Sequence, residues 1–300
     1  MRKPDFFIVG APKSGTTAMN EYLAQHPEIF IPRGKEYHFF GSDLKKSKRK
    51  YIHDTDRYLS LFIQAQNEKR IGEASVMYLC STMAPIEIKR FNAAAQVIVM
   101  LRNPVDMLYS FHSQLLYGGF EDIADFKAAL EAEEDRKQGK RVPQGTLLLN
   151  ALFYRDVARY SGQVQRYFEV FSRDNVHIII FDDFKRNTGR EYRETLRFLG
   201  VNPDFQPTFE VINPNKRARS KLVTKLYQRP PQLVRWPVRA LIPLKIRRIL
   251  EEKARHLNTK YERRSDMDAK LKEFLKKEFA PEIEKLSELL DRDLTHWSRN

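Results

Sequence analysis

The chain of 300 residues contains one cysteine, Cys80, so no disulfide can form within it. A lone thiol is usual in proteins of a reducing compartment. The sequence has no run of about 18 apolar residues, which argues against a membrane-spanning helix. The stretch before Gly10 is too short for the apolar part of a signal peptide. These absences predict a globular, cytoplasmic protein that has no membrane anchor.

Acidic residues are missing from one long region. Residues 211–250 hold eleven Lys and Arg but no Asp or Glu, and the whole chain carries a net charge of +14. Such a block is either a solvated helical face or a surface for an anionic partner, which could be nucleic acid, a membrane surface or an anionic small molecule. The block lacks a base-reading motif and is interrupted by prolines, so we expect no specific nucleic-acid recognition. Apolar residues among its cations, such as Trp236, leave peripheral membrane contact open.

The hydrophobic pattern alternates between strands and helices. Buried strands are predicted at 6–9, 70–73, 96–101 and 176–181. Helices are predicted at 16–26, from Pro104 onward, and at 121–137, 147–171, 188–199 and 266–290. We expect 121–137 to be exposed and 147–171 to be one long helix with a buried aromatic stripe. The alternation predicts a single α/β domain spanning 1–300, in which helices flank a central parallel sheet in three layers and the C-terminal part is helical.

A glycine-containing loop, Gly10 to Thr17, joins the first predicted strand to the first predicted helix. It has the G-x-x-x-x-G spacing of a phosphate loop. In a nucleotide triphosphatase the next residue is a lysine that reaches the β- and γ-phosphates, but here it is Thr16, and the lysine is Lys13. Backbone N–H groups at the start of a helix can still bind phosphate. The loop therefore predicts a phosphate ligand that needs no metal-bridged triphosphate.

Two motifs together resemble the sulfotransferases that use 3′-phosphoadenosine 5′-phosphosulfate (PAPS). One is Pro12-Lys13-Ser14-Gly15-Thr16-Thr17, and the other is Leu101-Arg102-Asn103-Pro104 followed by Ser110. The resemblance runs nearly end to end and implies a fold like that of the P-loop NTPases, with no metal ion. It implies donor-binding roles for Lys13, Ser14, Gly15, Thr16 and Thr17 at the 5′-phosphosulfate, for Arg102 and Ser110 at the 3′-phosphate, and for Lys216, Arg217 and Arg219 in a late loop that closes over the 3′-phosphate.

The segment from Gly34 to Phe40 resembles the heparan-sulfate-type and bacterial branch of this family. The resemblance implies that Glu36 is the general base and that Lys13 neutralises charge on the leaving phosphate. A positioned base contributes about 10²–10⁴ in rate. His38 is the rival base, because imidazole titrates near neutral pH. Where that branch carries Glu-Lys-Thr, this chain has Glu73-Ala74-Ser75, so the lysine of that motif is absent and only Glu73 and Ser75 could contact the acceptor.

The predicted reaction is transfer of a sulfuryl group from PAPS to a hydroxyl of a saccharide, a lipid or a small alcohol or phenol. The acceptor could be acidic or lipid-linked. One alternative is a P-loop kinase or NTPase, because the strand that ends at Asp182-Asp183 is similar to a Walker B strand. The other is a basic nucleic-acid-binding protein. The position of Lys13 and the arginine that ends strand 96–101 both favour an anionic donor without Mg²⁺.

Overall fold

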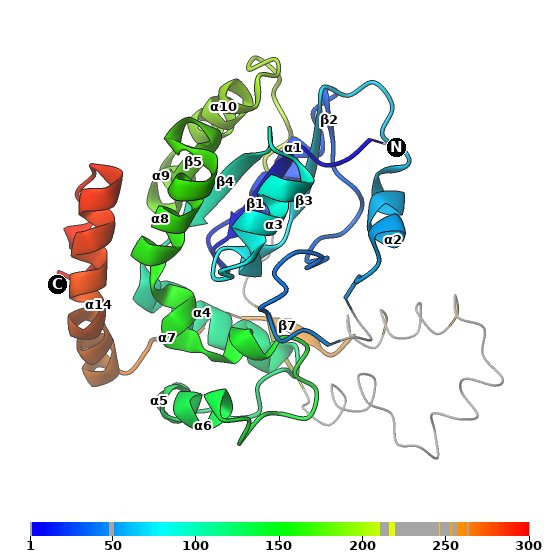
Figure 1. Ribbon diagram of the computed structural model, residues 1–300. Coiled ribbons are helices and arrows are strands. Elements are labelled where there is room, and N and C mark those ends of the chain that lie inside the picture. Colours follow the sequence, from blue (N-terminus) through cyan, green and yellow to red (C-terminus); the bar gives the residue numbers. More distant parts are fainter. Residues whose placement is uncertain are drawn as a thin grey trace.

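The computed structural model describes residues 2–47, 51–210, 216–219, 246, 253, 257–262 and 264–299, with the backbone alone at 216–218 and 261. Its centre is a five-stranded sheet in the order β2-β3-β1-β4-β5 (Figure 1). The strands are β1 (Phe6–Gly10), β2 (Ile29–Phe30), β3 (Arg70–Ala74), β4 (Gln96–Leu101) and β5 (Val176–Ile180). All neighbouring pairs are parallel, so the predicted parallel sheet is confirmed.

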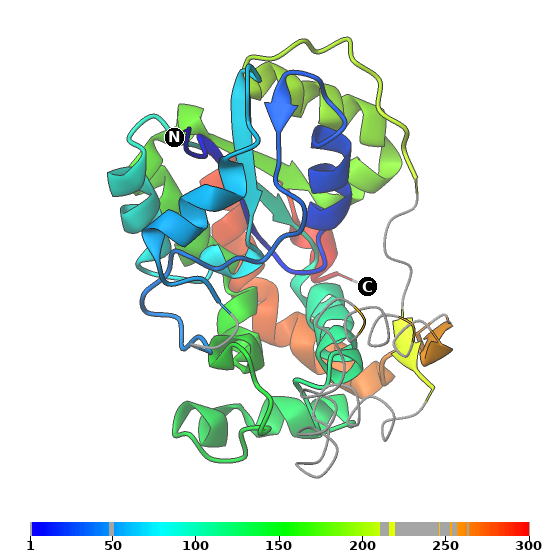
Figure 2. The same cartoon turned by 90° about the vertical axis from the view of Figure 1, so that its right-hand side faces the viewer.

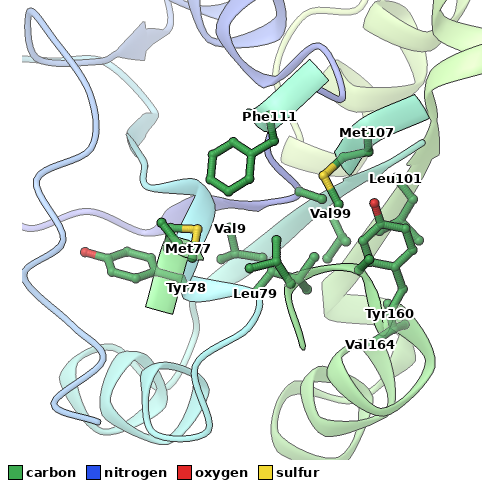
Figure 3. Packing of buried hydrophobic residues seen from close by; sticks show 14 of the residues in the cluster. Val9, Met77, Tyr78, Leu79, Val99, Leu101, Met107, Phe111, Tyr160 and Val164 are labelled. Atoms are coloured by element: carbon green, nitrogen blue, oxygen red, sulfur yellow. The ribbon is translucent and has the colours of Figure 1, made fainter. Parts of the chain in front are cut away.

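Helices cover both faces of the sheet. Because successive side chains of a strand point to opposite faces, Phe6 and Ile8 pack on one side and Phe7 and Val9 on the other. The first face is covered by α1 (Thr16–Leu23) and α10 (Thr188–Leu199). The second is covered by α3 (Ala84–Phe91), α4 (Pro104–Tyr117), α8 (Tyr160–Phe171) and α14 (Ala269–Leu290). Figure 3 shows side chains of β1 and β4 meeting those of α4 and α8 in this second layer. The three-layer α/β fold with a helical C-terminal part is confirmed.

Shorter elements connect these layers. They are α2 (Thr55–Leu59), α5 (Phe126–Glu131), α6 (Glu133–Lys137), α7 (Tyr154–Ala158) and α9 (Phe181–Arg186). A separate antiparallel pair is formed by β6 (Lys216–Ala218) and β7 (Thr259–Tyr261). Figure 2 shows this pair beside the helices below the sheet, and β6 contacts α4.

The prediction of one long helix over 147–171 is wrong. The segment is a 3₁₀ turn at Leu149–Leu152, then α7, then α8, with non-helical backbone at Phe153 and Arg159. Contacts from elsewhere replace the helical hydrogen bonds. The side-chain amide of Gln163 donates to the carbonyl of Asp156 (2.7 Å), and the N–H of Ser161 donates to a glutamate of α14 (2.6 Å). The aromatic stripe is nevertheless buried as predicted.

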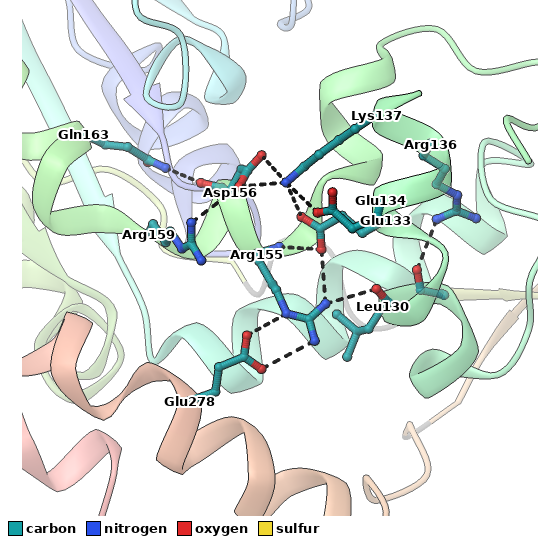
Figure 4. Close-up of polar contacts among 11 residues, drawn as sticks. Leu130, Glu133, Glu134, Arg136, Lys137, Arg155, Asp156, Arg159, Gln163 and Glu278 are labelled. Carbon is teal, nitrogen blue, oxygen red and sulfur yellow. Dashed lines mark hydrogen bonds and ion pairs between the residues drawn. The ribbon is translucent and has the colours of Figure 1, made fainter. Parts of the chain in front are cut away.

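The prediction that 121–137 is one exposed helix is also wrong, because the segment forms two helices and buries three charged residues. Arg136 donates to Glu121 at 2.6 Å, and both side chains are fully buried. Nearby, Arg155 of α7 joins Glu133 of α6 to Glu278 of α14 (Figure 4). Charges can be buried when they are paired in this way, and a hydrophobicity pattern does not reveal the pairing.

The strand order fixes where a ligand can bind. From β1 the chain first builds β2 and β3 on one side and then β4 on the other. In open parallel sheets, ligands bind outside the carboxyl ends of the strands at such a switch point. The carboxyl ends of β1 and β4 lead directly into the predicted phosphate loop and into Arg102.

Candidate active site

The loop between β1 and α1 is pinned against the end of β4. The N–H of Ala11 donates to the carbonyl of Met100 (2.6 Å), and a guanidinium N–H of Arg102 donates to the carbonyl of Lys13 (3.2 Å). No side chain of the described residues caps α1, and its first turn carries no acidic residue. The N–H groups at the amino end of this helix, with the positive end of its dipole, can therefore receive an anion.

Gly15 is required at the start of α1. Its φ is +89°, in a region that residues other than glycine rarely adopt. A Cβ added at this position would lie 3.1 Å from the ring of Phe184. Ser14 is fully buried, and its hydroxyl donates to the carbonyl of Pro12 (3.3 Å). The Ser14 hydroxyl thus points toward the backbone of its own loop.

The hydroxyls of Thr16 and Thr17 both accept hydrogen bonds from Lys35, whose Nζ lies 3.3 Å and 3.1 Å from their Oγ1 atoms. The same Nζ lies 3.0 Å from Oε1 of Glu36. The loop and the predicted base, although about twenty residues apart in the chain, are therefore brought together through one ammonium group. From the sequence, Glu36 could instead be a surface carboxylate paired with Lys35 or Arg33; the pair with Lys35 is present, whereas the contacts of Lys35 with the loop were not predicted.

The Glu36 carboxylate has partners on both oxygens. Its Oε2 lies 3.1 Å from Nε2 of His38 and accepts a hydrogen bond from the N–H of Val76 (3.0 Å). Burial alone would raise the pKa of this carboxyl, but the charge of Lys35 and the hydrogen bond with His38 outweigh burial and lower the pKa to about 2. Glu36 is therefore ionised at neutral pH.

His38 is buried, and its ring packs edge-on against Tyr51 and Tyr78, 5.0 Å and 5.9 Å between centroids. Because its Nε2 is engaged by the Glu36 carboxylate, the ring is placed to orient that carboxylate. The two rival bases of the sequence prediction are thus neighbours in one hydrogen-bonded pair.

The backbone around these side chains is strained. Lys13, Glu36 and His38 have φ angles of +59°, +63° and +48°, and they are three of the six non-glycine residues with positive φ in the described part of the chain. Such conformations are costly and cluster at functional sites. The turn is fixed by long-range contacts, since the Glu36 N–H donates to the carbonyl of Ala74 (2.8 Å) and the Lys46 ammonium donates to the carbonyl of His38 (2.9 Å).

The buried carboxyl group of Glu73 is connected to this turn through Ser75. The hydroxyl of Ser75 accepts the N–H of His38 (3.1 Å) and donates to Glu73. The other carboxyl oxygen of Glu73 accepts from the hydroxyls of Tyr58 (2.9 Å) and Tyr78 (3.2 Å). Burial raises the pKa of Glu73 to about 7 in spite of these donors. Glu73 and Ser75, which the sequence suggested as possible acceptor contacts, are buried and hydrogen-bonded to protein groups, and their contact with an acceptor stays a prediction.

A second cluster of cationic and polar side chains lies at the end of β4. The Arg102 guanidinium lies over the ring of Phe181, 4.9 Å from its centroid. Ser110 of α4 is buried, and its hydroxyl accepts from Arg264 (3.0 Å), a residue of the segment between β7 and α14. Burial, followed by the nearby charge of Arg102, lowers the pKa of Arg264. Two guanidinium groups and a hydroxyl thus gather here, although Arg264 has no sequence signal that distinguishes it from the other 52 Lys and Arg.

The late basic loop is described only in part. Lys216 and Arg217 belong to β6 by their backbone, but their side chains lie outside the described residues. Arg219 is exposed, and its N–H donates to the carbonyl of Asn258 (2.8 Å). Most of the basic block 211–250, including Trp236, also lies outside the described residues. The roles of these cations stay predictions.

The aspartates of the Walker B-like strand face the C-terminal segment. The indole N–H of Trp297 donates to Asp182 (2.8 Å), and Asp183 pairs with Arg292.

In the described part of the chain, no three His, Cys, Asp or Glu side chains gather as a metal site. Within the same residues, no helix has both the length and the apolar character needed to cross a membrane. A surface hollow lined by Phe62, Ile63 and two neighbours lies at the amino end of the sheet, away from the loop.

Fold and loop place the protein among the α/β proteins whose P-loop-like fold binds an anionic group at the carboxyl end of the sheet. The family described as "Sulfotransferase domain" matches residues 3–225, and the chain belongs to this sulfotransferase family. The predicted family and enzyme class are thereby confirmed, and the match favours them over the kinase and nucleic-acid-binding alternatives.

Individual relatives agree with this assignment. The crystal structure of a sulfotransferase from Alicyclobacillus acidocaldarius is 30% identical, with a TM-score of 0.75 over 100% of both chains. Membrane-associated sulfotransferase kil1 of Dictyostelium discoideum is 33% identical over 34% of this chain and 21% of its own length. Human bifunctional heparan sulfate N-deacetylase/N-sulfotransferase 2 is 26% identical over 67% of this chain and 22% of its own length. The chain thus spans about a fifth of the length of these two curated relatives.

Proposed function

We propose that this protein transfers the sulfuryl group of PAPS to a hydroxyl group of an acceptor. The observation that carries the proposal is the contiguity of an anion-binding loop with an ionised carboxylate, joined through Lys35. A donor with a 5′-phosphosulfate and a 3′-phosphate needs two anion sites. The loop at β1 and the Arg102–Ser110–Arg264 arrangement at β4 would supply them.

The first anion site would hold the reacting end of the donor. The N–H groups at the start of α1, the hydroxyls of Thr16 and Thr17, and the ammonium of Lys13 would bind the 5′-phosphosulfate. Gly15 adopts the positive φ with which the loop turns into α1. Arg102 and Arg264 would bind the 3′-phosphate, because guanidinium groups can donate two parallel hydrogen bonds to phosphate oxygens. Arg219, in the segment that follows β6, is the described cation of the late loop.

The acceptor hydroxyl would attack sulfur in line with the leaving phosphate. Its proton passes to the Glu36 carboxylate as the new S–O bond forms and the S–O bond to the phosphate breaks. Lys13 would neutralise the negative charge that develops on the phosphate oxygen. His38 would keep the carboxylate oriented through its 3.1 Å contact. The products are a sulfate ester and adenosine 3′,5′-bisphosphate.

The relatives suggest which class of acceptor to test first. The name of the human N-sulfotransferase refers to heparan sulfate, which makes saccharides the first class of acceptor to test. Lipids and small alcohols or phenols form the other classes. The basic composition favours an acidic member of any of these classes.

The test is an assay with ³⁵S-labelled PAPS against separate panels of saccharides, lipids and small alcohols, without added metal. We expect the wild-type protein to transfer label to acceptors of one panel, and the Glu36→Gln variant to transfer none. Hydrolysis of ATP that depends on Mg²⁺, with no PAPS binding in calorimetry, would overturn the proposal.

A further inference from the structure

We propose that Lys35 is a positioning residue that couples donor binding to the general base. Its ammonium is shared between the phosphate loop and Glu36, and a bound donor would draw it toward the loop. The inference rests on the proposed function, because it concerns the same loop and the same carboxylate. It goes beyond it by assigning a role to a lysine that the reaction scheme does not use.

The geometry places Lys35 between the two groups. An ammonium has three N–H donors, and those of Lys35 are directed at Thr16 (3.3 Å), Thr17 (3.1 Å) and Glu36 (3.0 Å). Its side chain is 19% exposed, so these contacts are partly shielded from water and stronger than a surface ion pair. All three donors are already used on protein groups at the point where the loop would meet the donor.

A donor in the loop changes this distribution. Its phosphosulfate adds negative charge beside Thr16 and Thr17, the two hydroxyls that Lys35 already touches. Because its three donors are already engaged, the ammonium can bind the new anion only by weakening one of these contacts, and we infer that this is the contact with Glu36. Coupling of this kind is reciprocal. A stronger interaction between the donor and Lys35 weakens the ion pair between Lys35 and Glu36, and a stronger ion pair weakens binding of the donor.

Release of Lys35 would make Glu36 a better base. The groups that face this carboxylate are Lys35, His38, Tyr51 and Glu73, and Lys35 exerts the largest of the influences that lower its pKa. With the ammonium engaged by the donor, the pKa of Glu36 rises and the carboxylate accepts a proton more readily. The base would thus be weak while the site is empty and would strengthen when the sulfuryl group is in place.

A double-mutant cycle tests the coupling directly. Binding of adenosine 3′,5′-bisphosphate is measured by calorimetry for the wild type, Lys35→Met, Glu36→Gln and the double variant. In the wild-type background, Glu36→Gln frees Lys35 and should tighten binding by roughly threefold to tenfold. In the Lys35→Met background the same change should alter binding less than about twofold. Lys45→Met, which removes an exposed lysine of the same stretch, is the matched control and should leave the effect of Glu36→Gln unchanged.

A second measurement follows the carboxyl group itself. Carbon-13 NMR titration of Glu36 should show a higher pKa in Lys35→Met than in the wild type, and Lys35→Arg should restore the low value. An equal effect of Glu36→Gln in both backgrounds, or an unchanged Glu36 pKa in Lys35→Met, overturns the coupling while the proposed function stands. If the nucleotide binds to none of the four proteins, the proposed function fails and this inference fails with it.

Discussion

At the scale of single residues, the proposed reaction depends on the ionised carboxylate of Glu36. The change Glu36→Gln keeps the shape of the side chain but removes the proton acceptor. We expect turnover in the ³⁵S assay to fall by about 10²–10⁴ while adenosine 3′,5′-bisphosphate still binds. His38→Asn is the companion variant, and its loss should be smaller because His38 orients the base. The opposite order of the two losses would make His38 the base.

Glu73 makes stability depend on pH in the direction opposite to most carboxylates. Its pKa is raised to about 7 by burial, so the folded state holds a proton that the unfolded chain releases at lower pH. The stability that this proton contributes is present below the usual carboxyl pKa and is lost as pH rises through about 7. We expect the free energy of unfolding to fall by an amount on the order of 3 kcal/mol between pH 4.5 and 7 from this group.

The matched variant is Glu73→Gln, which imitates the protonated form. Denaturant unfolding of both proteins over this pH range should show a flatter curve for the variant. Parallel curves would mean that Glu73 is ionised in the folded protein.

The sequence could predict some of these residues and not others. Lys13 and Arg102 lie in motifs that follow predicted strands, so pattern and family resemblance together located them. Lys35 and Arg264 act through contacts across the fold, to a loop about twenty residues away and to a helix more than 150 residues away. A turn with positive φ at two non-glycine residues, as at Glu36 and His38, leaves no mark in composition or periodicity.

At the scale of elements, the phosphate loop depends on glycine at the start of α1. Gly15→Ala places a Cβ 3.1 Å from Phe184 at a φ of +89°. We expect a loss of stability of about 1 kcal/mol or more, together with weaker binding of adenosine 3′,5′-bisphosphate. Gly162→Ala in α8 is the control, because its Cβ would meet nothing within 4 Å, and alanine should stabilise that helix by roughly 0.4–1 kcal/mol. Equal effects of the two changes in thermal unfolding would contradict the strain argument.

We expect the segment between β7 and α14 to contact the 3′-phosphate of the donor through Arg264. Arg264→Gln removes the guanidinium that contacts Ser110. We expect binding of adenosine 3′,5′-bisphosphate to weaken about tenfold and binding of adenosine 5′-phosphate to stay the same, because a hydrogen bond to a charged group contributes about 1.5–3 kcal/mol. Lys260→Gln, an exposed lysine of β7 paired with Glu262 (3.4 Å), is the control. Equal losses for both nucleotides would place Arg264 elsewhere in the site.

Elements were predicted well where burial alone sets the pattern. The strand 96–101 matches β4 residue for residue, because both of its faces are covered and every residue after Gln96 is apolar and buried. The two-residue strand β2 was missed because it is too short to show a period. The helix predictions at 121–137 and 147–171 failed because ion pairs and long-range hydrogen bonds, rather than propensity, decide where those helices end.

At the scale of the whole molecule, the strand order brings the two proposed anion sites to one edge of the sheet. Helix α14 joins the same core through Leu275, Phe279 and two further residues. The family match ends at residue 225, whereas this helix begins at Ala269. The packing of α14 supports one domain over 1–300, which stays a prediction.

The net charge of +14 leads to the last prediction, because eleven of the cations lie in the block 211–250. A long-range field speeds the encounter with an anionic acceptor and is screened as salt rises from about 0.02 M to 0.2 M. We therefore expect kcat/KM to fall steeply with salt for an acidic acceptor and to stay nearly constant for a neutral one of the same class. Replacing Lys221 and Lys225 by glutamine should flatten the slope for the acidic acceptor, and Lys127→Gln with Lys270→Gln, outside the block, should not. Equal slopes in the two double variants would show that the block acts only through the overall charge, as a solvated surface does.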